Sequence, residues 1–323
     1  MANNASLMVS VVIPSYGNFA GLLRCLDSVH SSTRMPHGSF EEVVVTSGYT
    51  DEEVESLRFR GSRVTQLDRP APTSLSRNIG AESCTAKFLL FLDDDNVVAP
   101  DAIFLLSEAL SRWDDAVVVG PAMYYGTAPD RLWCAGVRRS RVLMKTTFRT
   151  QLPDPTPERM SSDDFPNCFM VRRKEFETIN GFDALRFPQQ WEEGDLARRL
   201  AGRFGGAAFV VPQSRIWHYI ELPLVRRLHL RNGDRAFLVA RGRAMFTALH
   251  GDSLQWLAYL VAAQWMFGAF YLSTTLSLPR SQRTSVLVGY LKGMRAGLVH
   301  GWRARAENRR IARTSGAHIR TYR

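Results

Sequence analysis

Three consecutive aspartates, Asp93, Asp94 and Asp95, directly follow the five apolar residues 88–92. A short apolar run of this kind predicts a β-strand that is buried on both faces. Ligands of open α/β sheets bind beyond the carboxyl ends of the strands, so the aspartates are expected at a binding site. Adjacent carboxylates repel one another unless a positive charge joins them. A hard divalent cation that holds a phosphate-bearing substrate meets this requirement, and an acidic turn without a ligand is the alternative.

A second acidic group lies farther along the chain. Glu192, Glu193 and Asp195 follow Trp191 at the start of a predicted helix, residues 192–203. The helix dipole favours acidic side chains in this first turn and explains one or two of them. It explains three beside a tryptophan poorly, so the group is also a candidate catalytic site. The Trp191 ring either stacks on a bound ligand or belongs to the core.

Two further side chains have both a chemical and a structural interpretation. His218 follows the last predicted strand, where its imidazole is either a metal ligand or a structural group. Arg77, within the segment Ser76-Arg-Asn78, either approaches a phosphate-bearing ligand or forms a salt bridge to the aspartates. The fold must therefore position two acidic groups, an imidazole and a guanidinium.

The elements that position these residues are predicted from apolar runs and helical patterns. Strands are predicted at residues 9–13, 41–45, near 64, 88–92, 116–119, 169–171 and 207–211, with helical patterns between most of them. This alternation predicts a mostly parallel, doubly wound α/β sheet. Residues 136–148 form a basic, strand-rich patch. Residues 151–162 are rich in proline and polar side chains and are expected to form a mobile loop.

The cysteines and the N-terminus bear on the compartment. Cys25, Cys84, Cys134 and Cys168 are widely spaced among apolar neighbours, with no Cys-x-x-Cys pair. This pattern favours buried thiols over metal ligands or disulfides. Residues 1–8 have neither the charged nor the apolar region of a signal peptide. Together these features predict a reducing, cytoplasmic location.

Several segments, taken together, resemble the family-2 glycosyltransferases of the GT-A fold. They occur in the order of that family over residues 9–218, about two thirds of the chain. The segments are Val11-Val-Ile-Pro-Ser-Tyr16, Ser76-Arg-Asn-Ile-Gly80, Leu92-Asp-Asp-Asp95, Gly181-Phe-Asp183, Trp191-Glu-Glu-Gly-Asp-Leu196 and His218. The resemblance implies a Rossmann-like GT-A domain and metal-dependent transfer of a sugar, with inversion, from a nucleotide-diphosphate donor.

The resemblance also implies a role for each candidate residue. Glu193 is expected to be the base for the acceptor hydroxyl, although many relatives have Asp there, and Glu192 or Asp195 is the alternative. A Mg²⁺ or Mn²⁺ ion is expected on Asp93, Asp95 and His218. The nucleotide-sugar is expected to contact Pro14, Tyr16, Thr46, Arg77, Asp93 and Asp94. The acceptor is expected to contact Trp191 and Asn167.

One segment departs from the family pattern. Relatives usually place an aspartate after the second strand to hold the nucleotide base, whereas this chain has Thr46 in the segment Val45-Thr-Ser-Gly-Tyr-Thr-Asp51. We therefore assign no nucleotide from the sequence. Two alternative functions share the fold or the chemistry: a nucleotidyl- or phosphosugar transferase, and a non-catalytic saccharide-binding protein.

The last third of the chain differs from the rest in charge. From Glu221 onward it has 17 Lys/Arg and 4 Asp/Glu, a balance of +13. Residues 253–279 contain no charged side chain and six large aromatic ones. The pattern suits a helical hairpin lying on an anionic membrane surface, a core or homo-oligomer interface, or a membrane span. Nucleic acid would also suit the charge, but no recognition motif accompanies it, so we expect no nucleic-acid partner.

The sequence thus predicts two domains. Residues 1–219 are expected to form the GT-A catalytic domain, and residues 220–323 a basic, helical, membrane-associating region. The expected acceptor is a saccharide or a lipid-linked glycan of polysaccharide biosynthesis. The expected location is the cytoplasm, on the cytoplasmic face of the membrane.

Overall fold

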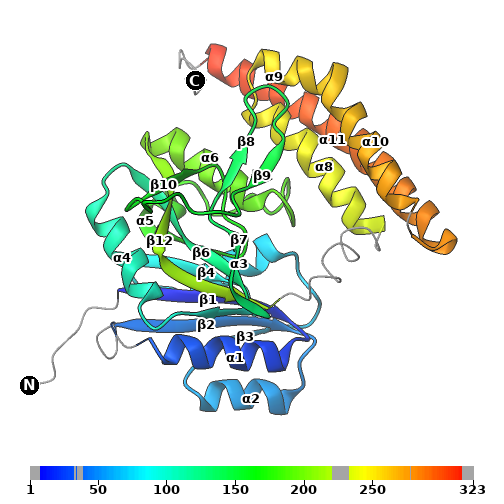
Figure 1. The fold of residues 1–323 in the computed structure, drawn as a ribbon. Helices are drawn as coiled ribbons and strands as arrows, with labels where there is room; N and C mark the ends of the chain where they lie inside the picture. The colour runs from blue at the N-terminus through cyan, green and yellow to red at the C-terminus, as the bar shows by residue number, and fades with distance from the viewer. Residues whose placement is uncertain (1–7, 33, 35–38, 220–232, 277, 315–323) are drawn as a thin grey trace, which may run out of the picture. The chain divides into compact units, whose positions relative to one another are not determined.

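A computed structural model describes residues 8–32, 34, 39–219, 233–276 and 278–314 (Figure 1). The chain forms two compact units. The sheet unit comprises Met1–Arg138, Thr147–Ala184 and Glu192–Ile220, and the helical unit comprises Arg139–Thr146, Leu185–Trp191 and Glu221–Arg323. The expected domain boundary at residues 219 and 220 adjoins residues 220–232, which lie outside the described residues, and it stays a prediction.

Among the described residues, ten strands form one mixed sheet. Its main path runs β10-β12-β6-β11-β4-β1-β2-β3, with β5 paired to β12 and β7 to β6. The strands are β1 (Val9–Tyr16), β2 (Phe40–Ser47), β3 (Arg63–Leu67), β4 (Phe88–Leu92), β5 (Asn96–Val98), β6 (Ala116–Tyr125), β7 (Ala128–Cys134), β10 (Met160–Ser162), β11 (Cys168–Arg172) and β12 (Ala207–His218). Strands β4, β1, β2 and β3 are parallel to one another, and β11 lies antiparallel between β4 and β6. A further pair, β8 (Val137–Arg139) and β9 (Thr146–Phe148), forms a separate two-stranded sheet.

Helices cover both faces of the sheet because its strands are apolar on both sides. Val11 and Ile13 of β1 pack into one core cluster with Leu22 and Leu26, whereas Val12 packs into the other. The first cluster takes side chains from α1 (Phe19–His30), α2 (Asp51–Phe59) and α4 (Ala102–Arg112). The second takes them from α3 (Thr73–Glu82), α5 (Arg173–Thr178) and α6 (Glu192–Phe204). This is the two-sided burial that a continuous apolar strand requires.

The predicted strands are all present, and most of them are longer than predicted. β12 continues to His218, so the histidine ends the strand instead of following it. Met160–Ser162, predicted as part of a loop, pairs with β12 as an edge strand. The antiparallel strand β7 was not predicted. The four cysteines are buried free thiols, as expected.

The helical unit contains one long helix and several shorter ones. Its elements are α8 (Gly233–His250), α9 (Ser253–Ala258), the π-helical turn η1 (Tyr259–Ala263), α10 (Gln264–Thr275) and α11 (Arg280–Thr314). Residues 253–275 are thus helical, as the hairpin interpretation requires. Among the described helices, none combines the length and the apolar character needed to cross a bilayer.

A row of glycines lets α11 approach α8 closely. A Cβ added at Gly289 would lie 2.0 Å from the Gly233 carbonyl oxygen, and one at Gly293 would lie 2.2 Å from that of Phe237. At Gly297 the corresponding distance is 2.6 Å, to the Arg241 oxygen. These glycines recur every four residues, so they lie on one face of α11. Side chains on that face would hold the two backbones apart.

We predict opposite effects for the same substitution at two helical glycines. Gly→Ala in a free helix stabilises by about 0.5–1 kcal/mol, because alanine loses less conformational freedom on folding. Gly268→Ala in α10, whose nearest neighbour would be a Tyr290 ring carbon at 3.8 Å, is expected to behave so. Gly293→Ala is expected to destabilise the chain, because the added carbon meets the α8 backbone. Denaturant unfolding of both full-length variants checks this, and stabilisation by Gly293→Ala would contradict the close packing.

Candidate active site

The carboxyl ends of β1, β2 and β4 meet the end of β12 at one edge of the sheet. Asp93, Asp94 and Asp95 follow β4 at this edge. In the antiparallel pair β5–β12, His218 lies opposite Asn96, the residue after the aspartates. This register brings His218 Nε2 to 2.9 Å from Asp95 Oδ2. Two segments more than a hundred residues apart are thereby joined at the position where α/β sheets bind ligands.

Arg77 on α3 links the two acidic groups of the site. Its guanidinium is fully buried, with Nη2 2.8 Å from Asp93 Oδ1 and Nη1 2.9 Å from Glu193 Oε1. Glu192 lies 4.0 Å from the same nitrogen. Burial by itself would lower the arginine pKa, but the carboxylates outweigh it and raise the pKa. The salt-bridge interpretation of Arg77 is thus the one present in the structure, and its contact with a nucleotide stays a prediction.

The carboxylates around Arg77 are poorly hydrated. Burial raises the pKa of Glu193, and Arg77 offsets part of that rise while the charge of Asp164 adds to it. Burial likewise raises the pKa of Asp93 and, more strongly, that of Glu192. Glu192 Oε2 is buried and has no hydrogen-bond partner within the described part of the chain. Glu193 therefore combines a raised pKa with a firm position, which are the properties of a general base.

Asp94 is held by residues that the sequence interpretation did not include. Ser15 Oγ donates to Asp94 Oδ2, and Asn18 Nδ2 donates to Oδ1 at 3.1 Å. The Tyr49 hydroxyl lies 2.6 Å from Ser15 Oγ. Burial and the neighbouring aspartates raise the Asp94 pKa to about 6, although both hydrogen bonds oppose the rise. Ser15 and Tyr49 sit at the carboxyl ends of β1 and β2, and this shared position is the signal that could have identified them.

The Asp95–His218 pair offers donor atoms that suit a divalent cation. Asp95 Oδ1 is buried without a hydrogen-bond partner among the described residues. Carboxylate and imidazole are both ligands of Mn²⁺, and Mg²⁺ needs only one or two protein carboxylates beside phosphate oxygens and water. No cluster of three or more His, Cys, Asp or Glu groups able to share an ion occurs in the described residues. The pair therefore fits an ion whose other ligands come from a substrate.

Asn167 lies beside His218 at this edge. β11 pairs with β4, and the Asn167 carbonyl accepts the Asp93 backbone N–H at 3.0 Å. Its Nδ2 is 3.0 Å from His218 Nδ1. The Trp133 ring packs edge-on against the imidazole, with centroids 4.7 Å apart. Asn167 and Trp133 thus orient His218, and the expected contact of Asn167 with an acceptor stays a prediction.

The residues expected at the nucleotide lie at the ends of β1 and β2. Pro14 pairs with Val45, and Thr46 is buried with an Oγ1 that has no hydrogen-bond partner among the described residues. Tyr16 is 66% exposed at the end of β1. An exposed ring and a buried hydroxyl in neighbouring strands are suitable contacts for a base, but their binding role stays a prediction.

Asp195 and Trp191 have mainly structural contacts. Asp195 Oδ2 accepts from Arg199 Nε at 2.7 Å, one turn along α6. The Trp191 ring belongs to the helical unit, where it packs on Phe246 at 5.3 Å between centroids. The Arg243 guanidinium lies 5.4 Å from the Trp191 centroid. A catalytic role for Asp195 and an acceptor contact for Trp191 stay predictions.

Two solved structures resemble this chain in fold. One is GalNAc-T7 with UDP, GalNAc and Mn²⁺, with a TM-score of 0.58 and 18% identity, covering 80% of this chain and 55% of that one. The other is the mannosyltransferase PcManGT from Pyrobaculum calidifontis in complex with GDP-Man and Mn²⁺. Its TM-score is 0.55 at 15% identity, and the match covers 94% of this chain and 88% of that one. Both are glycosyltransferases, and the likeness confirms the predicted GT-A fold.

Curated sequences match over shorter segments. An uncharacterized glycosyltransferase of Rickettsia bellii (strain RML369-C) is 30% identical over 93 residues, which is 28% of this chain and 13% of that protein. The uncharacterized glycosyltransferase YibD of Escherichia coli (strain K12) is 28% identical over 101 residues, 30% of this chain and 28% of that protein. The matched segment thus spans only a minor part of either relative.

The family model described as glycosyl transferase family 2 matches residues 10–179, more than half of the chain. The match includes Arg77, the three aspartates and Asn167. Together with the GT-A fold and the residues gathered at the end of β4, it confirms the resemblance read from the sequence. The chain belongs to glycosyl transferase family 2.

Proposed function

We propose that the chain is a metal-dependent, inverting glycosyltransferase that moves a hexosyl group from a nucleoside-diphosphate donor to a saccharide or lipid-linked glycan in polysaccharide biosynthesis. The observation that supports this most is the double ion pair of Arg77. It connects Asp93, on the side expected for the donor, to Glu193, on the side expected for the acceptor. A donor site and a base that contact the two terminal nitrogens of one buried guanidinium suit direct displacement of the nucleotide by an acceptor hydroxyl.

The donor side of the proposal rests on Asp95 and His218. With Asp93, they would hold a Mg²⁺ or Mn²⁺ ion, which would neutralise the diphosphate and stabilise negative charge on the departing nucleotide. GalNAc-T7 and PcManGT were both solved with Mn²⁺ and a nucleotide or nucleotide-sugar, which supports this assignment. Pro14, Tyr16, Thr46 and Asp94 would line the nucleotide.

The acceptor side rests on Glu193. Its raised pKa suits removal of a proton from a sugar hydroxyl as the new bond forms. Arg77 fixes one carboxylate oxygen and leaves the other for the acceptor. Glu192 and Asp195 would support the base, and Trp191 and Asn167 would contact the acceptor.

The helical unit supports attachment to a membrane surface on the cytoplasmic side. Exposed apolar side chains lie along α9, η1 and α10 and just after α10. They are here called the apolar face: Leu254, Leu257, Val261, Trp265, Met266, Phe270, Leu272 and Leu276. The exposed residues of α11 include Arg280, Lys292, Arg295 and Arg303. Apolar burial with nearby positive charge is the combination that holds a helix on an anionic leaflet.

We predict that donor binding requires the metal ion. Asp95→Ala removes a carboxylate needed to join the ion to the diphosphate, so affinity for the donor should fall about tenfold or more, as chelation of the metal should also cause. Calorimetry with UDP- and GDP-sugars, with and without EDTA, measures this. Equal affinity in all conditions would contradict the metal assignment.

We predict that Glu193→Gln lowers transfer about 100-fold or more while donor affinity stays near that of the wild type. The variant keeps the shape of the side chain but cannot accept the proton. In the wild type, Glu193 is active when deprotonated, so kcat should fall as the pH drops through a pKa above the ordinary value for glutamate, about 4.3. Near-normal transfer by Glu193→Gln, with Glu192→Gln or Asp195→Asn inactive, would assign the base to a neighbour.

We predict that the full-length protein co-sediments with anionic liposomes more than with neutral ones. High salt should release only part of the protein. The Debye length falls from about 10 Å at 0.1 M to about 3 Å at 1 M, so salt weakens the attraction between charges, whereas the burial of apolar side chains persists. Trp265→Glu should weaken binding, whereas Phe59→Glu, at a 93% exposed position on α2, should not. Failure of the folded wild type to bind, together with an oligomer in solution, would assign the apolar face to a subunit interface.

A further inference from the structure

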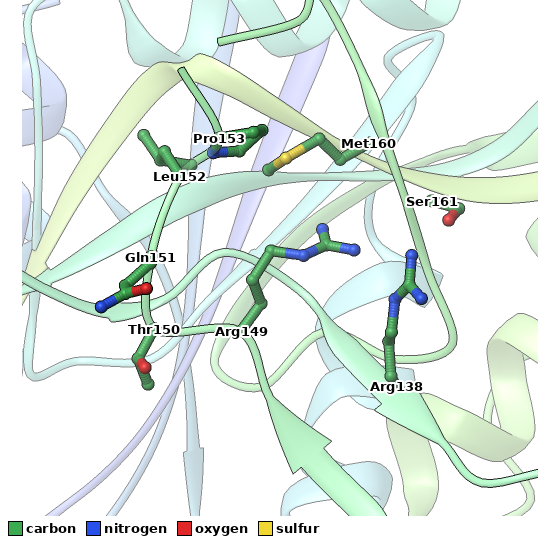
Figure 2. A pocket seen from close by; sticks show the side chains of 8 residues that line it. All are labelled: Arg138, Arg149, Thr150, Gln151, Leu152, Pro153, Met160 and Ser161. Carbon is green, nitrogen blue, oxygen red and sulfur yellow. The ribbon is translucent and has the colours of Figure 1, made fainter. Parts of the chain in front are cut away.

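The sheet unit contains a cavity whose lining does not include the three aspartates. A cavity of about 640 Å³ is lined by Arg138 of β8, the segment 149–153 after β9, and Met160 and Ser161 of β10 (Figure 2). Arg138 belongs to the basic patch and residues 151–153, 160 and 161 to the proline-rich connection that the sequence singled out, and Arg149 and Thr150 lie between the two segments. Neither segment has a part in the donor site or the base described above.

Two arginines face into this cavity. Figure 2 shows the guanidinium groups of Arg138 and Arg149 directed into the same space, beside Met160. Arg149 Nη1 donates to the Ala135 carbonyl at 3.1 Å, which fixes one end of its guanidinium. Burial and the like charge of Arg138 lower the Arg149 pKa. In the part of the chain that the structure describes, neither arginine forms an ion pair with a carboxylate.

Two close cations without a carboxylate partner repel each other, and an anion bound between them would relieve that repulsion. Guanidinium groups bind phosphate with paired N–H donors, and Ser161 and Thr150 provide further polar atoms at the cavity wall. Leu152, Pro153 and Met160 form an apolar side of the cavity, which suits a group larger than the phosphate itself. The lining therefore suits a phosphate or diphosphate attached to a larger group.

A short path along the chain and through one ion pair connects this cavity to α6, the helix that carries Glu193. Asp163, two residues after Ser161, pairs with Arg198 of α6 at 3.3 Å, and Arg198 lies five residues after Glu193. Two residues of extended chain span at most about 7 Å, and five residues of helix rise about 7.5 Å. Asp164 is close enough to Glu193 for its charge to act on that carboxylate. The cavity is thus on the Glu193 side of the sheet unit.

We infer that the Arg138–Arg149 cavity binds the phosphate or diphosphate group of an anionic acceptor and so directs the acceptor saccharide toward Glu193. The inference rests on the proposed glycosyl transfer and names the chemical class of its acceptor: a glycosyl phosphate or diphosphate, free in solution or attached to a lipid.

Binding is tested without any transfer reaction. Inorganic pyrophosphate is titrated into the full-length protein in EDTA, where a metal-dependent donor site cannot hold it. The wild type is expected to bind, and Arg138→Ala to bind about tenfold more weakly or worse, because the anion loses charge-assisted hydrogen bonds to one guanidinium. Arg58→Ala, an exposed arginine on α2, controls for net charge and should match the wild type. No binding by the wild type, or equal binding by Arg138→Ala, would overturn the inference.

Kinetics then identify the acceptor. Arg138→Ala should raise KM for a phosphorylated acceptor and leave the donor KM unchanged, while an acceptor without phosphate should show no such difference. Comparing a soluble glycosyl phosphate with a lipid-linked glycosyl diphosphate in vesicles distinguishes the two sources. A protein that binds pyrophosphate through Arg138 but binds no nucleotide-sugar would refute the proposed transfer alone. Metal-dependent donor binding with no effect of Arg138→Ala would refute the cavity alone.

Discussion

The buried guanidinium of Arg77 is the interaction on which the site depends. Without it, Asp93, Glu192 and Glu193 would bring uncompensated negative charge into a poorly hydrated interior, where removing one partner of an ion pair costs about 3–5 kcal/mol. The same contacts join α3 to the end of β4 and to the start of α6. Arg77 therefore both balances the negative charge of the site and fixes the relative positions of α3, β4 and α6.

Sheet register provides the second constraint. β5 is only three residues long, but its pairing with β12 puts His218 opposite Asn96 and beside Asp95. A shift of one residue would turn the imidazole to the other face of the sheet. The antiparallel β11 has an equivalent effect on the other side, since its pairing with β4 holds Asn167 against Asp93. The geometry of the acidic cluster thus depends on short antiparallel strands next to the parallel core.

Local patterns predicted the parallel core and the places of Asp93–Asp95, Glu193 and His218, because apolar strands and acidic helix starts are encoded in adjacent residues. The remaining contacts of the site depend on strands and helices that are far apart in the sequence. Ser15 and Tyr49 look like ordinary turn residues until β1 and β2 align their ends around Asp94. For Arg77 the sequence offered a salt bridge to the aspartates, whereas its second ion pair, to Glu193, depends on the position of α6. Met160–Ser162 is too short and polar to indicate a strand without its partner β12.

The glycine row of α11 also determines how α8 and α11 can move against each other. Contacts through bare backbone recur at Gly289, Gly293 and Gly297, four residues apart. A sliding motion of one or two residues would press side chains of α11 onto the carbonyl groups of α8, and the next matching arrangement is about 6 Å away along the axis. The glycine row therefore fixes the axial register of α8 and α11, so that the two helices are expected to move together as one body.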